Sequence, residues 1–369
     1  MTEQIPLFSA QAVNATVDLL RPLRRVLDSN WYILGKEGTE FEREFAEYCG
    51  VAHCVSAANG TDALELALRA LDVRVGDKVL LAANAGFYGS TAVHLIGAVP
   101  CYVDIDPVTL TISAERLREA LKTRPRAVII THLYGRLADI EEIVEAASQE
   151  GVPVIEDCAQ AHGAKRNGKF AGSFGTLACF SFYPTKNLGA LGDGGAVVSN
   201  DEARVGRLRQ LRQYGWGGKY HVAVSGGRNS RMDEIQAAIL REKLPLLDGW
   251  NSERRNIACR YNAAFSALPV ICPPSPGEDY VAHLYAIQLD ARDTFREFLK
   301  GYCVSTDVHY PVPDHLQTAY RSSQGRGSLP VTEDVCARIV SLPCYPGLRS
   351  GQIERVIEAV KLYFEQAGA

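Results

Sequence analysis

Short apolar segments alternate with amphipathic segments over the first two-thirds of the chain. Seven of the short segments are apolar on both faces and bounded by Gly, Pro, Asn or Asp, which is typical of strands buried between two layers of helices. The predicted strands cover residues 51–57, 78–83, 99–104, 126–133, 152–156, 177–182 and 195–199.

Helical patterns lie between these strands, at residues 61–71, 114–121 and 140–150. In the first of them Leu64, Ala67, Leu68 and Leu71 recur at positions i, i+3, i+4 and i+7, so they form one apolar stripe. Strands that alternate with helices predict an α/β protein with a seven-stranded, mostly parallel sheet covered by helices on both faces.

The pattern changes near Trp250. Long helices are predicted at 232–247 and 251–267, and shorter proline-punctuated segments follow, with helices at 294–302 and 351–364. We therefore predict a large α/β domain with an N-terminal arm over residues 1–250 and a smaller C-terminal α+β domain over residues 251–369. Residues 321–329 predict a flexible loop.

Composition narrows the class of protein. Hydrophobic residues make up 47% and charged residues 22%, which excludes a mainly disordered chain. The net charge of -4 offers no basic excess for nucleic acid or an anionic membrane, and no apolar run approaches the ~20 residues of a membrane span. The first residues do not follow the signal-peptide pattern, and the ten Cys, without any CxxC, are typical of reduced thiols. We expect a cytoplasmic protein.

Polar groups gather where predicted strands end, which is where open α/β sheets bind ligands. The string VSAANGTDALELAL places Asn59, Gly60 and Thr61 between a strand and a helix. Gly60 allows close approach of the backbone, and the free N–H groups of a helix N-terminus bind phosphate. The simpler alternative is an ordinary helix cap by Asn59 or Thr61.

The string GVPVIEDCAQAHGA ends a strand in Glu156 and Asp157, with Gln160 and His162 close behind. A buried carboxylate needs a cationic partner, such as a metal, an arginine or a protonated ring nitrogen. Adjacent strand residues point to opposite faces, and no metal-ligand spacing is present, so we predict no metal site.

The string CFSFYPTKNLGALGDGGAVV carries Ser181 on a strand and Lys186 on the turn that follows it. A lone lysine on a turn is usually a surface residue. Here it accompanies a phosphate loop and a strand-end aspartate, the three parts that pyridoxal 5′-phosphate needs. Lysine forms the Schiff base, aspartate keeps the pyridine nitrogen protonated, and a helix N-terminus holds the phosphate.

With RNSRMDEIQAAIL and HYPVPDHLQTAY, these strings resemble the DegT/DnrJ/EryC1/StrS family of nucleotide-sugar aminotransferases, which are fold-type I pyridoxal-phosphate enzymes. The resemblance implies that pyridoxal phosphate binds Lys186, with pyridoxamine phosphate as the intermediate form. It also implies a homodimer with shared active sites. The implied cofactor contacts are Asp157 at the pyridine nitrogen, Gln160 near the phenolic oxygen, Gly60, Thr61 and Ser181 at the phosphate, and Asn229 at the phosphate of the other subunit's site.

The loop LAANAGFYGS departs from the family pattern. Ala82 stands where proline is usual, and Gly86 stands where an aromatic residue stacks on the cofactor. Either Phe87 or Tyr88 would supply that stacking face. The resemblance places HYPVPDH at the mouth of the site, and packing or turn roles are the alternative for each substrate candidate. These candidates are His309, Tyr310, His315, Tyr32, Tyr183, Tyr214 and Arg231, the last as a ligand for the donor carboxylate or an ion-pair partner within the dimer.

The resemblance implies transfer of an amino group from L-glutamate to the ketone of a nucleotide-linked keto-deoxysugar, with C-3 of a dTDP-3-keto-6-deoxyhexose favoured. Lys186 would move the proton, which requires a lowered pKa for its amine. The alternatives are a C-4 aminotransferase acting on a UDP- or GDP-4-keto sugar and a non-catalytic regulatory or scaffold protein. A pyridoxamine-dependent dehydratase is disfavoured, because its relatives carry histidine in place of the lysine.

Overall fold

All seven predicted strands form one sheet, in the order β1-β9-β8-β5-β4-β2-β3. The computed structural model describes residues 3–274, 277–320 and 327–367. Within these residues β9 pairs antiparallel with β1 and β8, and the other neighbouring strands are parallel. The strands are β1 (His53–Ala57), β2 (Lys78–Ala82), β3 (Val99–Val103), β4 (Ala127–Thr131), β5 (Val154–Asp157), β8 (Leu177–Ser181) and β9 (Gly195–Ser199).

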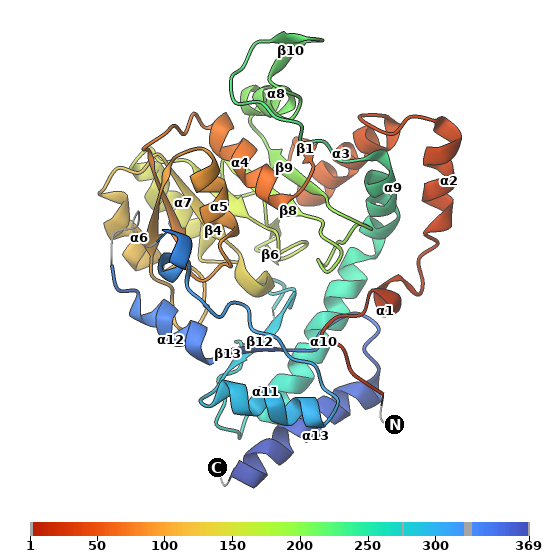
Figure 1. Ribbon diagram of the computed structural model, residues 1–369, viewed down its shortest axis with the longest axis vertical. Helices are drawn as coiled ribbons and strands as arrows, with labels where there is room; N and C mark the ends of the chain where they lie inside the picture. Colours follow the sequence, from red (N-terminus) through yellow and green to blue (C-terminus); the bar gives the residue numbers. More distant parts are fainter. Residues whose placement is uncertain (1–2, 275–276, 321–326, 368–369) are drawn as a thin grey trace.

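Helices cover the sheet on both faces, as the apolar pattern predicts (Figure 1). Along β4, Val128 and Ile130 belong to one apolar cluster while Ala127 and Ile129 belong to another, so consecutive side chains pack on opposite faces. The predicted stripe of the first helix is buried in the second cluster. The helices of this part of the chain are α1 (Ala10–Asn14), α2 (Leu20–Ser29), α3 (Lys36–Cys49), α4 (Gly60–Ala70), α5 (Tyr88–Leu95), α6 (Ala114–Leu121), α7 (Ile140–Gln149), α8 (Glu202–Leu211) and α9 (Glu234–Lys243).

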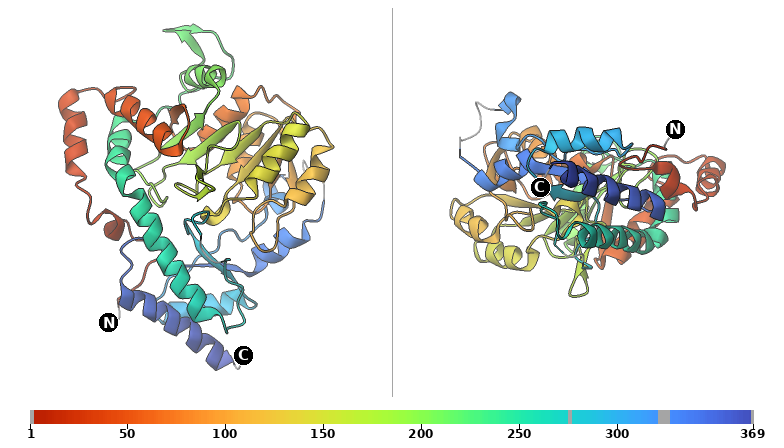
Figure 2. Two further views of the ribbon diagram at one scale, coloured as in Figure 1. Left: turned by 180° about the vertical axis from the view of Figure 1, so that it is seen from behind. Right: turned by 90° about the horizontal axis from the view of Figure 1, so that it is seen from below.

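The C-terminal part mixes helices with a two-stranded sheet, as predicted. Strand β12 (Tyr285–Gln288) pairs antiparallel with β13 (Ile339–Leu342). The long helix α10 runs from the large sheet toward α11 and α13 at the far end of the molecule (Figures 1 and 2). The helices are α10 (Leu247–Phe265), α11 (Arg292–Gly301), α12 (Pro330–Arg338) and α13 (Ser350–Ala367).

The predicted break between the two long helices is wrong in position. Helix α10 begins at Leu247 and continues through Trp250, and the irregular turn lies earlier, at Leu244–Leu246. Pro245 explains the shift, because it has no backbone N–H with which to continue α9. The predicted domain boundary at residue 250 therefore falls inside a continuous helix.

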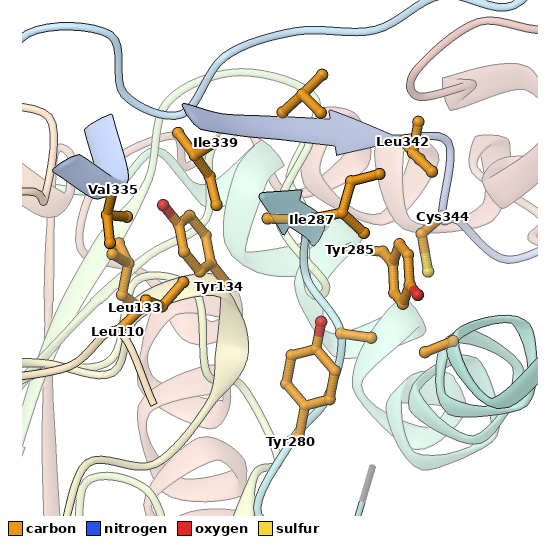
Figure 3. Packing of buried hydrophobic residues seen from close by; sticks show 14 of the residues in the cluster. Leu110, Leu133, Tyr134, Tyr280, Tyr285, Ile287, Val335, Ile339, Leu342 and Cys344 are labelled. Atoms are coloured by element: carbon orange, nitrogen blue, oxygen red, sulfur yellow. The ribbon is translucent and has the colours of Figure 1, made fainter. Parts of the chain in front are cut away.

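One apolar cluster joins the two parts of the chain. It contains Ile130 of the large sheet together with Tyr285 and Leu342 of the small one. Figure 3 shows Tyr134, Tyr280 and Tyr285 in this cluster, packed near the β12–β13 pair. The start of the described chain joins it too, since Ile5 is fully buried and forms a bridge with Val304. The division into two domains stays a prediction.

The shorter elements are β6 (Lys165–Arg166), β7 (Lys169–Phe170), β10 (Trp216–Gly218), β11 (His221–Val222) and the turns Leu133–Gly135, Asp314–Leu316 and Thr318–Tyr320. All ten cysteines are free, as predicted. None of the described helices has the length and apolar character needed to cross a membrane. Residues 321–326 of the predicted flexible loop lie outside the described residues.

Candidate functional site

A cavity of about 770 Å³ opens beyond the carboxyl ends of the central strands. Thr131, Asp157 and Ser181, which end β4, β5 and β8, all line its wall. The cavity brings together most of the predicted site residues, namely Gly60, Thr61, Tyr88, Asp157, Gln160, Ser181, Tyr183, Lys186, His309 and Tyr310.

Lys186 lies on the turn after β8, where its backbone N–H donates to the carbonyl oxygen of Tyr183 at 2.8 Å. Burial within the cavity wall lowers the pKa of its amine to about 8, although the negative charge of Asp157 opposes this shift. An appreciable fraction of the amine is therefore neutral near pH 7, which is what proton transfer by lysine requires.

Asp157 is buried at the end of β5, with only 5% of its surface exposed. Its carboxylate accepts hydrogen bonds from the backbone N–H of Ala159 at 3.1 Å and from the Thr131 hydroxyl at 3.2 Å. Desolvation raises the pKa of Asp157 above its usual value, while the Ala159 bond and the charge of Lys186 act in the opposite direction. A protonated ring nitrogen beside Asp157 would stabilise its ionised form.

The start of α4 and the end of β8 form a narrow cradle. A Cβ atom added at Gly60 would lie 2.6 Å from the Ser181 Cβ, so this position accepts only glycine. The Asn59 side chain caps the helix at the Asp62 N–H, 2.8 Å away, which confirms the simpler alternative for Asn59. Because α4 begins at Gly60, the N–H groups of Gly60 and Thr61 have no partner within the helix and remain available to an anion.

Gln160 is held by contacts at both ends of its amide. Its Oε1 accepts from the Tyr134 backbone N–H at 2.6 Å, and its Nε2 donates to the Tyr310 hydroxyl at 3.2 Å. The Tyr310 ring lies against Gly86, where an added Cβ would approach three ring atoms to 2.8–2.9 Å. Tyr310 therefore fills the space beside the position where the family pattern places an aromatic residue.

The structure separates the two candidates for the stacking face. Tyr88 lines the cavity. Phe87 does not: its ring stacks on Tyr320 with centroids 5.0 Å apart, and its backbone N–H donates to the buried Asp314 at 2.9 Å. Of the two residues, the geometry favours Tyr88, and stacking on the cofactor itself stays a prediction.

The HYPVPDH string contributes only its first part to the cavity. His309 Nδ1 lies 2.9 Å from the Ser341 hydroxyl, and burial lowers the pKa of this imidazole. His315 is turned away from the cavity, with its Nε2 3.1 Å from Glu333. His315 does not line the cavity of this chain, and its expected role at the mouth of the site stays a prediction.

Four predicted residues lie outside the cavity of their own chain, namely Tyr32, Tyr214, Asn229 and Arg231. Asn229 is exposed and forms a bridge with Gln213. The Arg231 guanidinium lies over the Tyr214 ring, 5.7 Å from its centroid. The roles expected for these four residues stay predictions.

Glu156 points to the opposite face of the strand from Asp157, as its adjacent position predicts. Its carboxylate accepts from the backbone N–H groups of Gly172, Phe174 and Gly175 at 2.6–2.9 Å and lies 3.0 Å from His132 Nε2. His132, Glu156 and Cys158 also place possible ligand atoms within 4.8 Å of one another. The contacts of Glu156 tie β5 to the loop that precedes β8, which makes it a structural residue.

Sequence reasoning missed Arg254, His283 and Thr131, which also line the cavity. Arg254 sits in a charged stretch of α10 that looks like an exposed helix face. His283 precedes β12, and its Nδ1 lies 2.9 Å from Asn187 Oδ1. A polar side chain beside an apolar segment was the only available signal, and it does not distinguish a site from the surface.

Comparisons with known proteins agree with this geometry. The model of the DegT/DnrJ/EryC1/StrS aminotransferase family matches residues 15–361. The dTDP-3-amino-3,6-dideoxy-alpha-D-galactopyranose transaminase of Aneurinibacillus thermoaerophilus is 43% identical over 363 residues, which are 97% of this chain and 99% of that protein. The UDP-N-acetyl-3-dehydro-alpha-D-glucosamine 3-aminotransferase of Acidithiobacillus ferrooxidans is 41% identical over 345 residues, 93% of each chain. The crystal structure of S. venezuelae DesV in complex with a ketimine intermediate has a TM-score of 0.95 and 40% identity, and the match covers 99% of both chains.

The fold and the cavity thus define a pyridoxal-phosphate type of aminotransferase architecture. This chain belongs to the DegT/DnrJ/EryC1/StrS aminotransferase family, whose members depend on pyridoxal phosphate. The prediction that the protein is an aminotransferase is therefore confirmed, and this class is favoured over a non-catalytic scaffold.

Proposed function

We propose that this chain binds pyridoxal phosphate and transfers the amino group of L-glutamate to the C-3 ketone of a dTDP-linked 3-keto-6-deoxyhexose. The observation that supports the chemistry is the meeting of Lys186, Asp157 and the Gly60–Ser181 cradle in one cavity. These three parts fit the three polar ends of the cofactor: the aldehyde, the pyridine nitrogen and the phosphate.

Each residue of the cavity would have its own role toward the cofactor. The Gly60 and Thr61 N–H groups and the Ser181 hydroxyl would hold the phosphate, and Asp157 would keep a proton on the pyridine nitrogen. The Gln160 Nε2 has a second hydrogen, which it can donate to the phenolic oxygen. When bound, the cofactor supplies an electron sink for the carbon that exchanges its proton. The neutral Lys186 amine would remove that proton and deliver it to a carbon two bonds away, on the other side of the nitrogen.

The proposed position of amination rests on the relatives. One relative is named for a dTDP-3-amino sugar and another for a UDP-linked 3-dehydro sugar, so position 3 is common to both names while the nucleotide differs. His309, Tyr310 and Tyr183 line the cavity and are the proposed contacts for the hexose. C-4 amination of a UDP- or GDP-linked sugar is the alternative.

A panel of substrates tests this proposal. The purified protein, with pyridoxal phosphate and L-glutamate, is offered dTDP-, UDP- and GDP-linked 3-keto and 4-keto sugars, and the amino sugar is identified by NMR. Amination of the dTDP-3-keto sugar at C-3 is expected, and the Lys186→Ala protein should give none. Amination only at C-4 would overturn the position, and amination of free keto acids alone would overturn the substrate class.

We further propose that the protein is a homodimer in which Asn229 of one subunit reaches the phosphate site of the other. The β10–β11 hairpin, which precedes Asn229, projects from the body of the molecule (Figure 1). Its Tyr220 and Val222 are 78% and 61% exposed, an unusual exposure for an aromatic and a β-branched residue. A second subunit would cover them, and it would also bring Tyr32, Tyr214 and Arg231 toward a substrate. We propose a cytoplasmic location, in keeping with the free cysteines.

A further inference from the structure

Arg254 is a buried cation in the wall of the cavity that contains Lys186. It extends from the middle of α10, and only 2% of its surface is exposed. Arg231, one of the sequence candidates and a possible ligand for the donor carboxylate, lies outside this cavity. Arg254 is therefore the arginine that the described residues place near the proposed reaction.

The hydrogen bonds of Arg254 leave part of its guanidinium unused. Its Nη1 donates to the carbonyl oxygens of Cys344, His283 and Ala282 at 2.6, 3.2 and 3.4 Å. Its Nε is buried and has no hydrogen-bond partner among the described residues. Nη1 thus makes every hydrogen bond that this side chain forms with the described part of the chain.

No carboxylate of the described residues lies within 4.0 Å of the Arg254 guanidinium. Burial lowers its pKa to about 10, so the side chain keeps its positive charge at neutral pH. A buried charge without a counter-charge is costly, because the neutral carbonyl groups replace only part of its hydration. An anionic ligand in the cavity would supply the missing counter-charge.

Two observations place this charge near the reacting lysine. Lys186 and Arg254 line the same cavity, and both lower the pKa of the buried His283 and His162 imidazoles. The phosphate cradle at Gly60 and Ser181 is a separate part of the wall. An anionic group on a ligand held at Lys186 could therefore contact Arg254 within the same cavity.

We propose that Arg254 binds a carboxylate of the amino donor. This inference rests on the proposed function, since it requires an amino acid to react at Lys186. The planar guanidinium can accept a carboxylate through two parallel hydrogen bonds, which an ammonium or a lone hydroxyl cannot provide. Arg254 would thereby distinguish an amino-acid donor from a simple amine.

The two halves of the reaction test the proposal separately in the holoenzyme. Arg254→Gln is expected to raise the L-glutamate concentration for half-maximal loss of the lysine-bound cofactor's visible absorbance by about 30-fold or more. The absorbance returns when the amine form of the cofactor reacts with a keto sugar. The keto-sugar concentration for half-maximal return should differ less than about threefold between Arg254→Gln and the wild type. Arg260→Gln is the matched control, because Arg260 lies on the same helix but is paired with Glu354 and Ser350 at the surface.

Binding of glutarate, an unreactive dicarboxylate, gives a readout without turnover. Calorimetry should show a dissociation constant for glutarate that is at least tenfold larger in Arg254→Gln and unchanged in Arg260→Gln. Because Nη1 also joins three carbonyl groups, Arg254→Lys is measured beside it. Lysine keeps the charge and a donor for those groups but loses the planar fork, so intermediate binding is expected.

Wild-type binding of glutarate by both Arg254 variants would overturn the proposal. If neither variant folds, a crystal structure of the wild-type holoenzyme with glutarate decides: a carboxylate within hydrogen-bond distance of Arg254 supports the inference, and glutarate elsewhere or unbound overturns it. A nucleotide diphosphate seated on Arg254 would overturn it as well. A protein that aminates no nucleotide sugar yet loses glutarate binding in Arg254→Gln would refute the proposed substrate and leave this inference standing.

Discussion

Burial shifts the pKa values of the two central site residues in opposite directions. Desolvation disfavours the charged form of each, so it lowers the pKa of Lys186 to about 8 and raises the pKa of Asp157. The two charges partly compensate each other. Each residue is thereby prepared for a ligand: the amine for covalent bond formation, and the carboxylate for a cationic ring.

Replacement of Asp157 by asparagine should reduce the rate of transamination by on the order of 100-fold or more. An amide cannot hold the pyridine nitrogen protonated, so the charge that develops in the transition state is less well stabilised. The measurement is single-turnover loss of visible absorbance with L-glutamate. Thr131→Val, which removes one hydrogen bond to Asp157 but keeps its charge, is the milder comparison. A loss below about threefold in Asp157→Asn would show that the carboxylate is merely structural.

The lowered pKa of Lys186 predicts how the cofactor-free protein captures pyridoxal phosphate. Only the neutral amine reacts, so the capture rate should rise about tenfold per pH unit below pH 8 and level off above it. If the lysine had an ordinary pKa, the capture rate would continue to rise up to about pH 10. Stopped-flow absorbance between pH 6 and 10, corrected for titration of the cofactor itself, distinguishes the two profiles.

The site is assembled where secondary-structure elements approach closely. Gly60 begins α4 against Ser181 at the end of β8, and Gly195 begins β9 against the Asn59 carbonyl, where an added Cβ would lie 2.3 Å from the oxygen. Two small residues thus allow one helix N-terminus to rest on two strand ends. The same contacts fix where the cradle lies relative to Lys186.

Gly60→Ala should therefore weaken binding of pyridoxal phosphate by about tenfold or more. The added methyl group, at 2.6 Å from the Ser181 Cβ, must push α4 away from β8 and tilt its N–H groups. Fluorescence titration of the cofactor-free protein measures the dissociation constant. Gly206→Ala is the control, because a Cβ at this position inside α8 meets nothing within 4 Å, and it should leave the dissociation constant unchanged. Equal affinities of the two variants for pyridoxal phosphate would contradict the proposal that Gly60 and Ser181 hold its phosphate.

The proposed homodimer would account for several features of the single chain. The projecting β10–β11 hairpin exposes Tyr220 and Val222, and Asn229 and Arg231 follow it outside the cavity of their own chain. In an isologous dimer each such surface would meet its own copy across a two-fold axis. One subunit could then complete the site of the other.

Mixing two inactive variants tests the shared site. In a Lys186→Ala and Asn229→Ala heterodimer, one site would hold both substitutions and the other neither. After random exchange, about a quarter of all sites should be intact, so activity should return to about that fraction. Exchange is verified with subunits of different mass. If Asn229→Ala alone is severely impaired and the exchanged mixture stays inactive, the site is not shared.

Much of this protein follows from local sequence. The seven strands and the apolar stripe of α4 depend on periodicity within short windows of sequence. The positions of Asp157 at a strand end and of Lys186 on the turn after a strand depend on turn residues within equally short windows. The strings around Gly60, Asp157 and Lys186 are also specific enough in combination to indicate the family, which the match over residues 15–361 confirms.

Contacts between distant segments account for what local sequence left open. Phe87 and Tyr88 are neighbours, yet a hydrogen bond from Phe87 to Asp314, 227 residues away, turns one ring from the cavity and leaves the other facing it. In the sequence, Arg254 is one of several charged residues on a helix. Only the fold brings the carbonyl groups of His283 and Cys344 within hydrogen-bond distance of it. Periodicity specifies which face of an element is buried. Which polar side chain meets which partner across the core depends on the packing of all the elements together, because such pairings become favourable only once distant groups have lost their water to one another.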